Sequence, residues 1–248
     1  MPFNVGGNIL TSTQLGYYNN TNIVRSGLVL YLDAGLVSSY PGSGTTWSDV
    51  SGYNNTPTTV NSPTFVTQSG GGWTVDSVGT NNFNLDSKAS IVNVAEGTVG
   101  GWVKFDSISG ANYVFISYGG NGTGGGFLLQ SESGTSTKFE LVLFGGGITG
   151  GRASAGETLS TPYVGKNMYM VGTYSTSVVK LYINGAEIAS SAKSSDSMPA
   201  QSYFRISSEY NRTRGVGGNI YTTHIYNRAL SASEVLQNYQ AQRQRFGA

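Results

Sequence analysis

Short apolar or alternating segments, separated by clusters of Gly, Asn, Ser and Thr, make up the chain from Ser26 onward. This pattern is typical of β-strands joined by turns. An apolar strand is predicted at residues 27–32, and a longer strand at 98–105 would place Val99 and Phe105 on the same face. Further strands are predicted at residues 113–118, 127–130, 139–144, 169–174, 204–206 and 220–226.

The clearest hairpin lies at residues 178–189, where two alternating segments flank Asn184 and Gly185. Asn-Gly favours the type I′ turn of a two-residue hairpin loop, because both central positions need a positive φ. The alternation predicts one buried face and one outer face. The buried face is expected to carry Val179, Leu181 and Ile183, and the outer face Lys180 and Tyr182.

Helical periodicity occurs only near the C-terminal end of the chain. Ser231 and Glu234 have the spacing of a capping box, in which each side chain bonds the backbone N–H of the other residue. Val235, Leu236 and Tyr239 then form a short apolar stripe. About a dozen short strands with one terminal helix predict an antiparallel β-sandwich in a single domain.

Residues 1–26 differ from the rest of the chain, because they are rich in Gly, Asn and Thr and show no sustained period. We expect an extended N-terminal arm at 1–26 and a folded domain at 27–248. The arm either folds back along its own domain or is held by the surface of another protein. The side chains expected to make its contacts are Phe3, Val5, Ile9, Leu10, Leu15, Tyr17 and Tyr18.

Composition excludes several classes of function. The chain has 14 Lys and Arg, 13 Asp and Glu, and a net charge of +1, so it lacks the basic excess of a nucleic-acid-binding protein. Without cysteine it has no disulfide or thiolate site, and its single histidine excludes a multi-histidine metal centre. No apolar run reaches the roughly 18 residues of a membrane span, and the N-terminus lacks the features of a signal peptide. We therefore expect no nucleic-acid or membrane partner. We also expect that the protein is made in a cytoplasm and either stays there or is assembled there into a larger particle.

Four segments carry a resemblance to a known family. They are Gly-Leu-Val-Leu-Tyr-Leu-Asp-Ala at 27–34, Gly-Gly-Trp-Val-Lys at 100–104, Val-Lys-Leu-Tyr-Ile-Asn-Gly at 179–185 and Ile-Tyr-Asn-Arg-Ala-Leu-Ser-Ala-Ser-Glu-Val at 225–235. Together they resemble the concanavalin A-like jelly rolls of the laminin-G-like family, over residues 27–246. The resemblance implies an all-β jelly-roll sandwich whose last strand turns a corner into a short capped helix.

A narrower resemblance rests on residues 39–47, 237–239 and 245–247, which are similar to laminin-G-like proteins of tailed bacteriophages. In those phages such domains are structural or surface components of the particle. This implies a non-enzymatic virion protein, either a capsid decoration or a tail-associated component. Attachment through the arm, with help from the basic end at 243–246, and a homo-oligomeric state on the particle are part of this expectation.

Glucanases share the jelly-roll fold, so catalysis has to be considered. Glycoside cleavage needs two carboxyl groups about 5–9 Å apart across one groove. Glu132 and Glu140 flank a Gly/Ser turn without the required spacing, and we interpret them as ordinary hairpin carboxylates. His224 lies in a predicted strand with no Gly-x-Ser-x-Gly motif in the chain, and is interpreted as an imidazole on the strand surface. The expectation is no enzymatic activity.

Several laminin-G-like domains bind calcium at the rim of the sandwich, and calcium needs six or more oxygen ligands. Asp33, Asp49 and Asp76 are isolated in this chain, and Asp33 is expected to cap the turn after its strand. The family's frequent Phe-Asp-Gly is replaced by Val75-Asp76-Ser77. We therefore expect no cofactor, with calcium as the less favoured alternative. The glycine-rich loops at 119–126 and 145–151 lack a phosphate-binding context and are interpreted as bulges and close approaches within the sheets.

Binding of sugar without catalysis is the alternative function. The loop at 207–215 contains Tyr210 for stacking against a sugar ring, with Asn211, Arg212 and Arg214 for polar contacts. This loop lies between two predicted strands and would project from the edge of the sandwich. Such a module would recognise a polysaccharide on the surface of a host cell. The alternative without ligand is a solvated turn or a contact with a neighbouring subunit.

Overall fold

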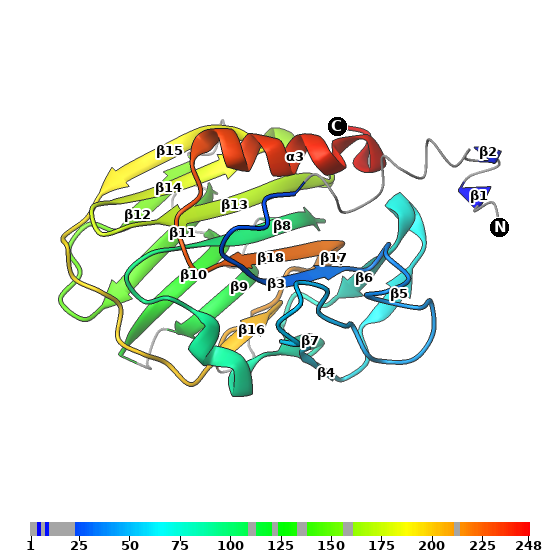
Figure 1. The fold of residues 1–248 in the computed structure, drawn as a ribbon, viewed down its shortest axis with the longest axis horizontal. Coiled ribbons are helices and arrows are strands. Elements are labelled where there is room, and N and C mark those ends of the chain that lie inside the picture. Colours follow the sequence, from blue (N-terminus) through cyan, green and yellow to red (C-terminus); the bar gives the residue numbers. More distant parts are fainter. Residues whose placement is uncertain are drawn as a thin grey trace.

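Two antiparallel sheets pack face to face in the computed structural model (Figure 1), which describes residues 4–5, 8–9, 23–108, 113–120, 124–132, 138–155, 161–210 and 214–248. Helix α3 (Ala232–Phe246) lies along the outer face of one sheet. In the described part of the chain no helix is long and apolar enough to cross a membrane. The prediction of a jelly-roll-like β-sandwich with one short C-terminal helix is confirmed.

One sheet has seven strands, and every neighbouring pair is antiparallel. From one edge to the other the strands are β12 (Arg152–Ala155), β11 (Lys138–Gly145), β10 (Gly125–Glu132), β9 (Tyr113–Gly120), β16 (Phe204–Ile206), β7 (Asn82–Asn84) and β4 (Thr58–Val60).

The other sheet has nine strands and is built around a long central strand. Its path runs β15 (Ala186–Ala192), β14 (Val178–Ile183), β13 (Met168–Tyr174), β8 (Gly97–Phe105), β17 (Gly218–Ile220), β6 (Gly72–Val75) and β5 (Thr64–Val66). Strand β18 (Thr222–Tyr226) pairs with β8 on one side and with β3 (Leu28–Asp33) on the other. The remaining elements are the paired strands β1 (Asn4–Val5) and β2 (Asn8–Ile9) and the 3-10 helices η2 (Gln68–Gly70), η3 (Asp86–Ile91) and η4 (Thr161–Tyr163).

The main core fills the space between the two sheets. The predicted inward faces of β8 and β14 are confirmed, because Val99 and Phe105 on β8 and Leu181 on β14 belong to one buried cluster. The opposite face of β14 carries Tyr182, which is buried in a different cluster on the outside of the nine-stranded sheet. The hairpin therefore contributes to two apolar layers.

Glycines occur where the strands approach too closely for any side chain. A Cβ added to Gly126 on β10 would overlap the carbonyl oxygen of Tyr118 on β9, and one on Gly101 would overlap the carbonyl oxygen of Thr222 on β18. Both partners are backbone atoms that are fixed by the sheet. Within its described residues, the interpretation of the 119–126 loop as a close approach is confirmed at Gly126.

A second apolar layer joins the outer face of the nine-stranded sheet to helix α3. Trp102 on β8 stacks on Phe246 with ring centres 4.1 Å apart, and on Tyr239 at 5.7 Å. Ile23 and Val24 are buried in the same layer. The packed body therefore includes residues from 23 onward, a few residues before the expected domain start at 27.

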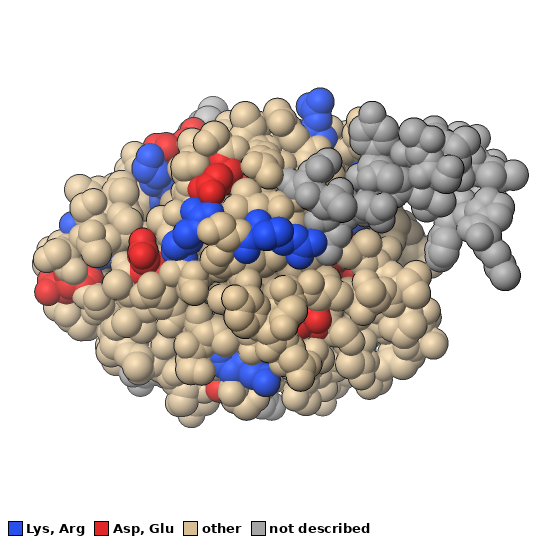
Figure 2. Space-filling view, in the orientation of Figure 1, with Lys and Arg blue, Asp and Glu red and all other residues tan. Residues whose placement is uncertain are grey.

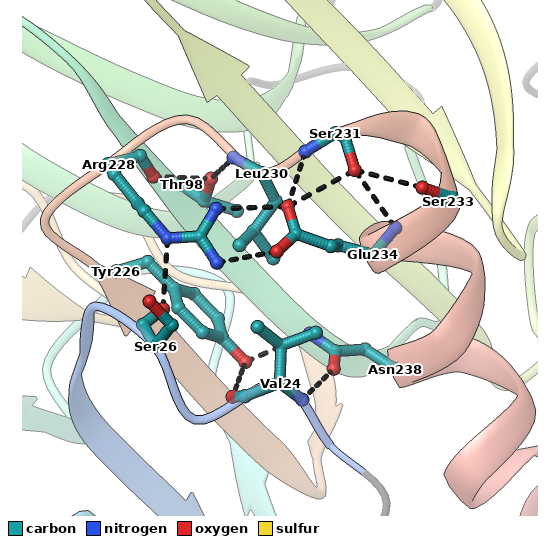
Figure 3. Close-up of polar contacts among 10 residues, drawn as sticks. All are labelled: Val24, Ser26, Thr98, Tyr226, Arg228, Leu230, Ser231, Ser233, Glu234 and Asn238. Atoms are coloured by element: carbon teal, nitrogen blue, oxygen red, sulfur yellow. Dashed lines mark hydrogen bonds and ion pairs between the residues drawn. The ribbon is translucent and has the colours of Figure 1, made fainter.

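Three residues connect the N-terminal segment, the last strand and the helix, and we call them the terminal clasp (Figure 3). The Tyr226 hydroxyl donates to the Val24 carbonyl at 2.9 Å and accepts from Asn238 Nδ2 at 2.9 Å. Asn238 Oδ1 accepts from the Val24 amide at 2.8 Å. Of the arm residues, Phe3, Leu10, Leu15, Tyr17 and Tyr18 lie outside the described residues, and for Val5 and Ile9 only the backbone pairing is described.

The corner between β18 and α3 forms as the motif at 225–235 predicts. Ser231 caps the helix by accepting from the Glu234 amide, while Glu234 accepts from the Ser231 amide. Arg228 adds a two-point ion pair to Glu234 and donates to the carbonyl of Ser26 (Figure 3). The capping box is confirmed, and Arg228 also holds the N-terminal segment against the helix start.

The basic end of the chain has a structural role that the attachment hypothesis did not anticipate. The Arg245 guanidinium pairs with Asp33 and donates to the carbonyls of Ser69 and Gly71. Its side chain is only 8% exposed, and Phe246 is buried on Trp102. The expectation that residues 243–246 form an attachment surface is therefore wrong for Arg245 and Phe246, because both are used within the fold.

Candidate functional site

The two glutamates considered for catalysis meet on the outer face of the seven-stranded sheet. Glu132 on β10 and Glu140 on β11 both accept from Arg152 Nη1, at 3.0 and 2.9 Å. Glu140 is fully buried and also accepts from Ser154 Oγ at 2.9 Å. Glu140 therefore lies in a buried cross-strand cluster with Arg152 and Ser154 of the neighbouring strand β12, rather than on an exposed hairpin.

The ion cluster of Glu132, Glu140 and Arg152 disfavours a role of Glu132 in general acid catalysis. Partial burial raises the pKa of this carboxyl, but hydrogen bonds from Lys138 and Arg152 outweigh burial, so the net shift of its pKa is downward. A general acid at neutral pH needs a carboxyl with a raised pKa. One guanidinium nitrogen placed between both carboxylates instead favours a structural ion cluster.

His224 is buried rather than exposed, so the prediction of an imidazole on the strand surface is wrong. It is 1% exposed beneath helix α3, where its ring lies 4.7 Å from that of Tyr31 and its Nδ1 is 3.2 Å from the Tyr169 hydroxyl. Burial lowers the pKa of His224 to about 3, against a smaller raising effect of Asp33. The ring is therefore neutral at ordinary pH and shielded from any substrate.

The three aspartates considered for calcium each serve their own turn. Asp33 accepts from the Gly35 amide at 2.9 Å, which confirms its predicted capping role, and its second partner is Arg245. Asp49 accepts from the Ser51 amide, and Asp76 accepts backbone amides in the same way. Among the residues that the structure describes, no three His, Cys, Asp or Glu side chains are grouped to hold a metal ion.

The loop predicted to bind sugar is anchored by an arginine whose side chain faces away from the core. Arg205 on β16 donates to the carbonyls of Glu209 and Tyr210, at 3.1 and 2.8 Å, and pairs with Asp86 at 2.8 Å. Its side chain is 4% exposed, so this anchor is well shielded from water. The first part of the loop is therefore ordered before any ligand binds, unlike a simple solvated turn.

Two tyrosines form an aromatic pair at this loop. Tyr210 lies against Tyr203 with ring centres 6.0 Å apart and planes inclined at 60°, and the Arg205 guanidinium carbon is 5.4 Å from the centre of the Tyr203 ring. Tyr203 is 37% exposed. Arg214 Nε is 3.4 Å from a carboxylate oxygen of Glu209. Of the predicted contact residues, Tyr210 thus pairs with Tyr203 and Arg214 pairs with Glu209, whereas Asn211 and Arg212 lie outside the described residues.

Tyr203 was missed by the sequence interpretation, although one signal was present. It immediately precedes β16, while Tyr210 follows the same strand, so the two rings flank one short strand. Charged residues make up only 11% of the chain, and the face drawn in Figure 2 accordingly shows mostly uncharged side chains.

A cavity of about 720 Å³ opens at a second place, beside the C-terminal end of α3. Its wall combines aromatic rings with amide, hydroxyl and ammonium groups from separate parts of the chain. It is lined by Gln68, Ser69, Lys104, Pro162, Tyr163, Gly165, Lys166, Asn167, Asn184, Tyr221, Phe246, Gly247 and Ala248. None of these residues was singled out as a binding residue from the sequence.

Comparison with solved structures finds the same fold in a domain of an arabinanase, in a sialidase and in the receptor-binding domain of a toxin. Domain 4 of AbnA, an extracellular GH43 arabinanase of Geobacillus stearothermophilus, in complex with arabinotriose, has a TM-score of 0.64 at 17% identity, over 86% of this chain and 98% of that domain. Trypanosoma rangeli sialidase in complex with sialic acid has a TM-score of 0.58 at 17% identity, over 90% of this chain but only 34% of the sialidase. The receptor-binding domain of botulinum neurotoxin type G has a TM-score of 0.57 at 17% identity, over 88% of this chain and 52% of that domain.

None of these three proteins is a phage component, so the expected link to bacteriophage particles gains no support from them. A comparison with curated proteins finds no match. A family model described as the Concanavalin A-like lectin/glucanases superfamily matches residues 76–236, which is more than half of the chain. With this match and the two-sheet architecture, the chain belongs to the concanavalin A-like lectin/glucanase superfamily.

Proposed function

We propose that this chain is a carbohydrate-binding domain and that the Tyr203–Tyr210 pair is its contact surface for sugar. The observation that carries the proposal is an aromatic pair, formed by the exposed Tyr203 and the half-buried Tyr210, at a loop that Arg205 already holds in place. Sugar rings present apolar C–H faces to aromatic rings, and their hydroxyls pair with nearby polar groups such as Arg214. An ordered loop reduces the entropy that a ligand must overcome on binding.

Two of the similar structures support this proposal, because each contains a bound sugar. The arabinanase domain is in complex with arabinotriose, and the sialidase is in complex with sialic acid. At 17% identity these similarities show only that this chain has the same fold. Its sugar specificity depends on its own side chains.

The test is calorimetric titration of the full chain with arabinotriose and a panel of other neutral oligosaccharides. Tyr210→Ala and Tyr203→Ala should each weaken binding at least about tenfold, which corresponds to about 1.4 kcal/mol. Tyr53→Ala is the matched control, because Tyr53 is 66% exposed elsewhere on the surface. Unchanged affinity in both variants, with a binding-competent wild type, would exclude this surface as the site.

We propose further that binding is not followed by hydrolysis. The support is Arg152, which lies between Glu132 and Glu140 and stabilises the ionised form of the Glu132 carboxyl. Incubation with the oligosaccharides that bind should release no new reducing ends. Release that Glu132→Gln and Glu140→Gln both abolish would establish a glycosidase instead.

The role of a virion structural protein, homo-oligomeric on a phage particle, stays a prediction that rests on the sequence resemblance alone. Truncation of the N-terminal arm tests this prediction, and the structure indicates where the chain should be shortened. Residues 1–22 should be removed, because Val24 and Ser26 bond the C-terminal part of the body. A truncated chain that folds and binds sugar but no longer enters a particle would support the arm hypothesis. Normal incorporation would refute it.

A further inference from the structure

The cavity at the end of α3 lies on the other side of the sandwich from the Tyr203–Tyr210 pair. Its wall comes from η2, from the loop between η4 and β13, and from β8 and the residue that joins β17 to β18. Its volume of about 720 Å³ is in the usual range for small-ligand sites, which is about 300–1,000 Å³. The space is sufficient for one or two sugar rings.

Aromatic side chains form part of the wall of this cavity. Tyr221 and Phe246 are 3% and 7% exposed and pack against each other with ring centres 5.2 Å apart. Tyr163 lines the same cavity from η4 and is half-buried. Rings that are already packed lose little freedom when a ligand stacks on them.

Polar groups at the cavity are fixed by the protein itself. Asn167 Nδ2 donates to Ser69 Oγ at 2.8 Å, and the Ser69 carbonyl accepts from Arg245 Nε at 2.6 Å. Asn184 Oδ1 accepts from the Tyr169 amide at 2.9 Å, which leaves the Asn184 NH₂ group as a donor for a ligand. This combination of aromatic faces and oriented amides suits a sugar ring and its hydroxyls.

Charge distinguishes this cavity from the rest of the chain. Acidic and basic residues are nearly balanced overall, at 13 and 14, but the cavity is lined by Lys104 and Lys166 and by no Asp or Glu. Lys166 has no ion pair with another described residue. Lys104 pairs with Asp106 at 2.8 Å, but the Asp106 side chain is 58% exposed, and ion pairs of exposed side chains contribute little to stability. A carboxylate on a ligand can therefore replace Asp106 at little cost.

From these observations we infer that the cavity is a second binding site, specific for a sugar unit that carries a carboxylate. The ring of this unit lies on the Tyr163–Tyr221 wall, its hydroxyls bond Asn167 and Asn184, and its carboxylate lies at Lys104 and Lys166. The inference does not rest on the Tyr203–Tyr210 surface, since no residue is shared between the two sites.

The test uses the full chain and three acidic probes, namely a galacturonic acid trimer, a disaccharide containing glucuronic acid, and N-acetylneuraminic acid. A neutral galactose trimer and inorganic phosphate are the ligand controls. We expect saturable binding of at least one acidic probe, which weakens as the salt concentration rises. In a Tyr210→Ala chain, which lacks the other sugar surface, the neutral trimer and phosphate should each bind at least about tenfold more weakly than the acidic probe. No binding of any acidic probe overturns the inference. Equal binding of the neutral trimer or of phosphate by the Tyr210→Ala chain also overturns it.

Variants locate the site. Lys166→Gln removes a charge that would pair with the carboxylate, and Tyr163→Ala removes a ring that would contact the sugar. Each should therefore reduce affinity for the acidic probe at least about tenfold. Lys88→Gln on η3 is the control for the same loss of charge elsewhere. Tyr210→Ala should leave acidic binding unchanged. Loss of acidic binding in Tyr210→Ala with normal affinity in Lys166→Gln would assign the acidic sugar to the other surface and overturn the inference.

Discussion

The substitution Tyr226→Phe isolates the contribution of the terminal clasp to stability. The hydroxyl of Tyr226 joins three elements that are far apart in the sequence, namely the segment at Val24, strand β18 and helix α3 through Asn238. Phenylalanine keeps the ring that packs under the helix and removes only this oxygen. Two hydrogen bonds of 2.9 Å are lost, while the apolar contacts remain.

The expected loss of stability depends on how deeply the two groups that lose their hydrogen-bond partner are buried. Asn238 is 0% exposed and Val24 is 8% exposed, so water does not readily replace the missing hydroxyl. A buried polar group left without a partner costs about 1–3 kcal/mol, which gives a total of about 3 kcal/mol after partial relaxation. For a protein of this size 1 kcal/mol lowers Tm by about 2–4 °C, so we expect a fall of about 6–12 °C.

The assay is thermal unfolding followed by circular dichroism, with urea unfolding to obtain the free energy. Tyr239→Phe is the matched control, because its ring also packs on Trp102 but its hydroxyl makes no hydrogen bond with another described residue. The control should change Tm little. A Tyr226→Phe protein with a Tm within about 2 °C of the control would refute the reasoning, since it would mean that the clasp is not a buried hydrogen-bonded unit.

Three further substitutions test other parts of the fold. The pKa of His224 is about 3 in the folded chain and 6.5 when unperturbed, so the unfolded state binds one more proton between these values. Stability should fall by up to about 1.4 kcal/mol per pH unit as pH decreases from about 6.5 to 3, and His224→Gln should reduce this slope in urea titrations at several pH values. Arg245→Met leaves Asp33 buried without its cation and should lower the free energy of unfolding by about 3–5 kcal/mol, measured by urea unfolding. Arg243 is exposed, so Arg243→Met is the control and should leave the free energy of unfolding almost unchanged. Gly101→Ala forces a Cβ onto a carbonyl of β18 and should cost about 1–3 kcal/mol, measured as a lower urea midpoint.

Much of the fold could be predicted because local rules determine it. Asn184-Gly185 fixes a turn with positive φ at both residues between the antiparallel strands β14 and β15. Ser231 and Glu234 specify the helix start within four residues, and the capping box forms in the structure. Signals of this kind need no knowledge of distant contacts, which is why they survive the step from sequence to structure.

The errors concern polar residues whose partners are far away in the sequence. Arg245 and Asp33 are separated by 212 positions, and their pairing converts a basic tail into part of the fold. His224 alternates with core residues on β18, so its pattern is the same whether the outer face of the strand meets water or helix α3. Glu140 differs in that its partners Arg152 and Ser154 are only 12 and 14 positions away, but the register of β12 is still needed to place them beside it.

The candidate sites were found only in part for a related reason. Tyr210 was identifiable within one loop, but its partner Tyr203 lies on the other side of β16 and becomes a neighbour only when the loop folds back over Arg205. The cavity is harder still, since its wall is assembled from segments between Gln68 and Ala248. A site of this kind leaves no local motif, and its excess of lysine over acidic residues is visible only after folding.

The position of α3 decides which aromatic residues of this sandwich are available to a ligand. From alternation alone, Trp102, Tyr169 and Tyr182 would form a broad aromatic platform on the outer face of the nine-stranded sheet. The helix covers all three, with Trp102 fully buried against Phe246, so they act as a second core. Loss of sugar binding after substitution of these residues would therefore report displacement of the helix and would require a stability measurement beside it. The residues left for recognition are those that the helix does not reach, at the Tyr203–Tyr210 pair and at the cavity beside the end of the helix.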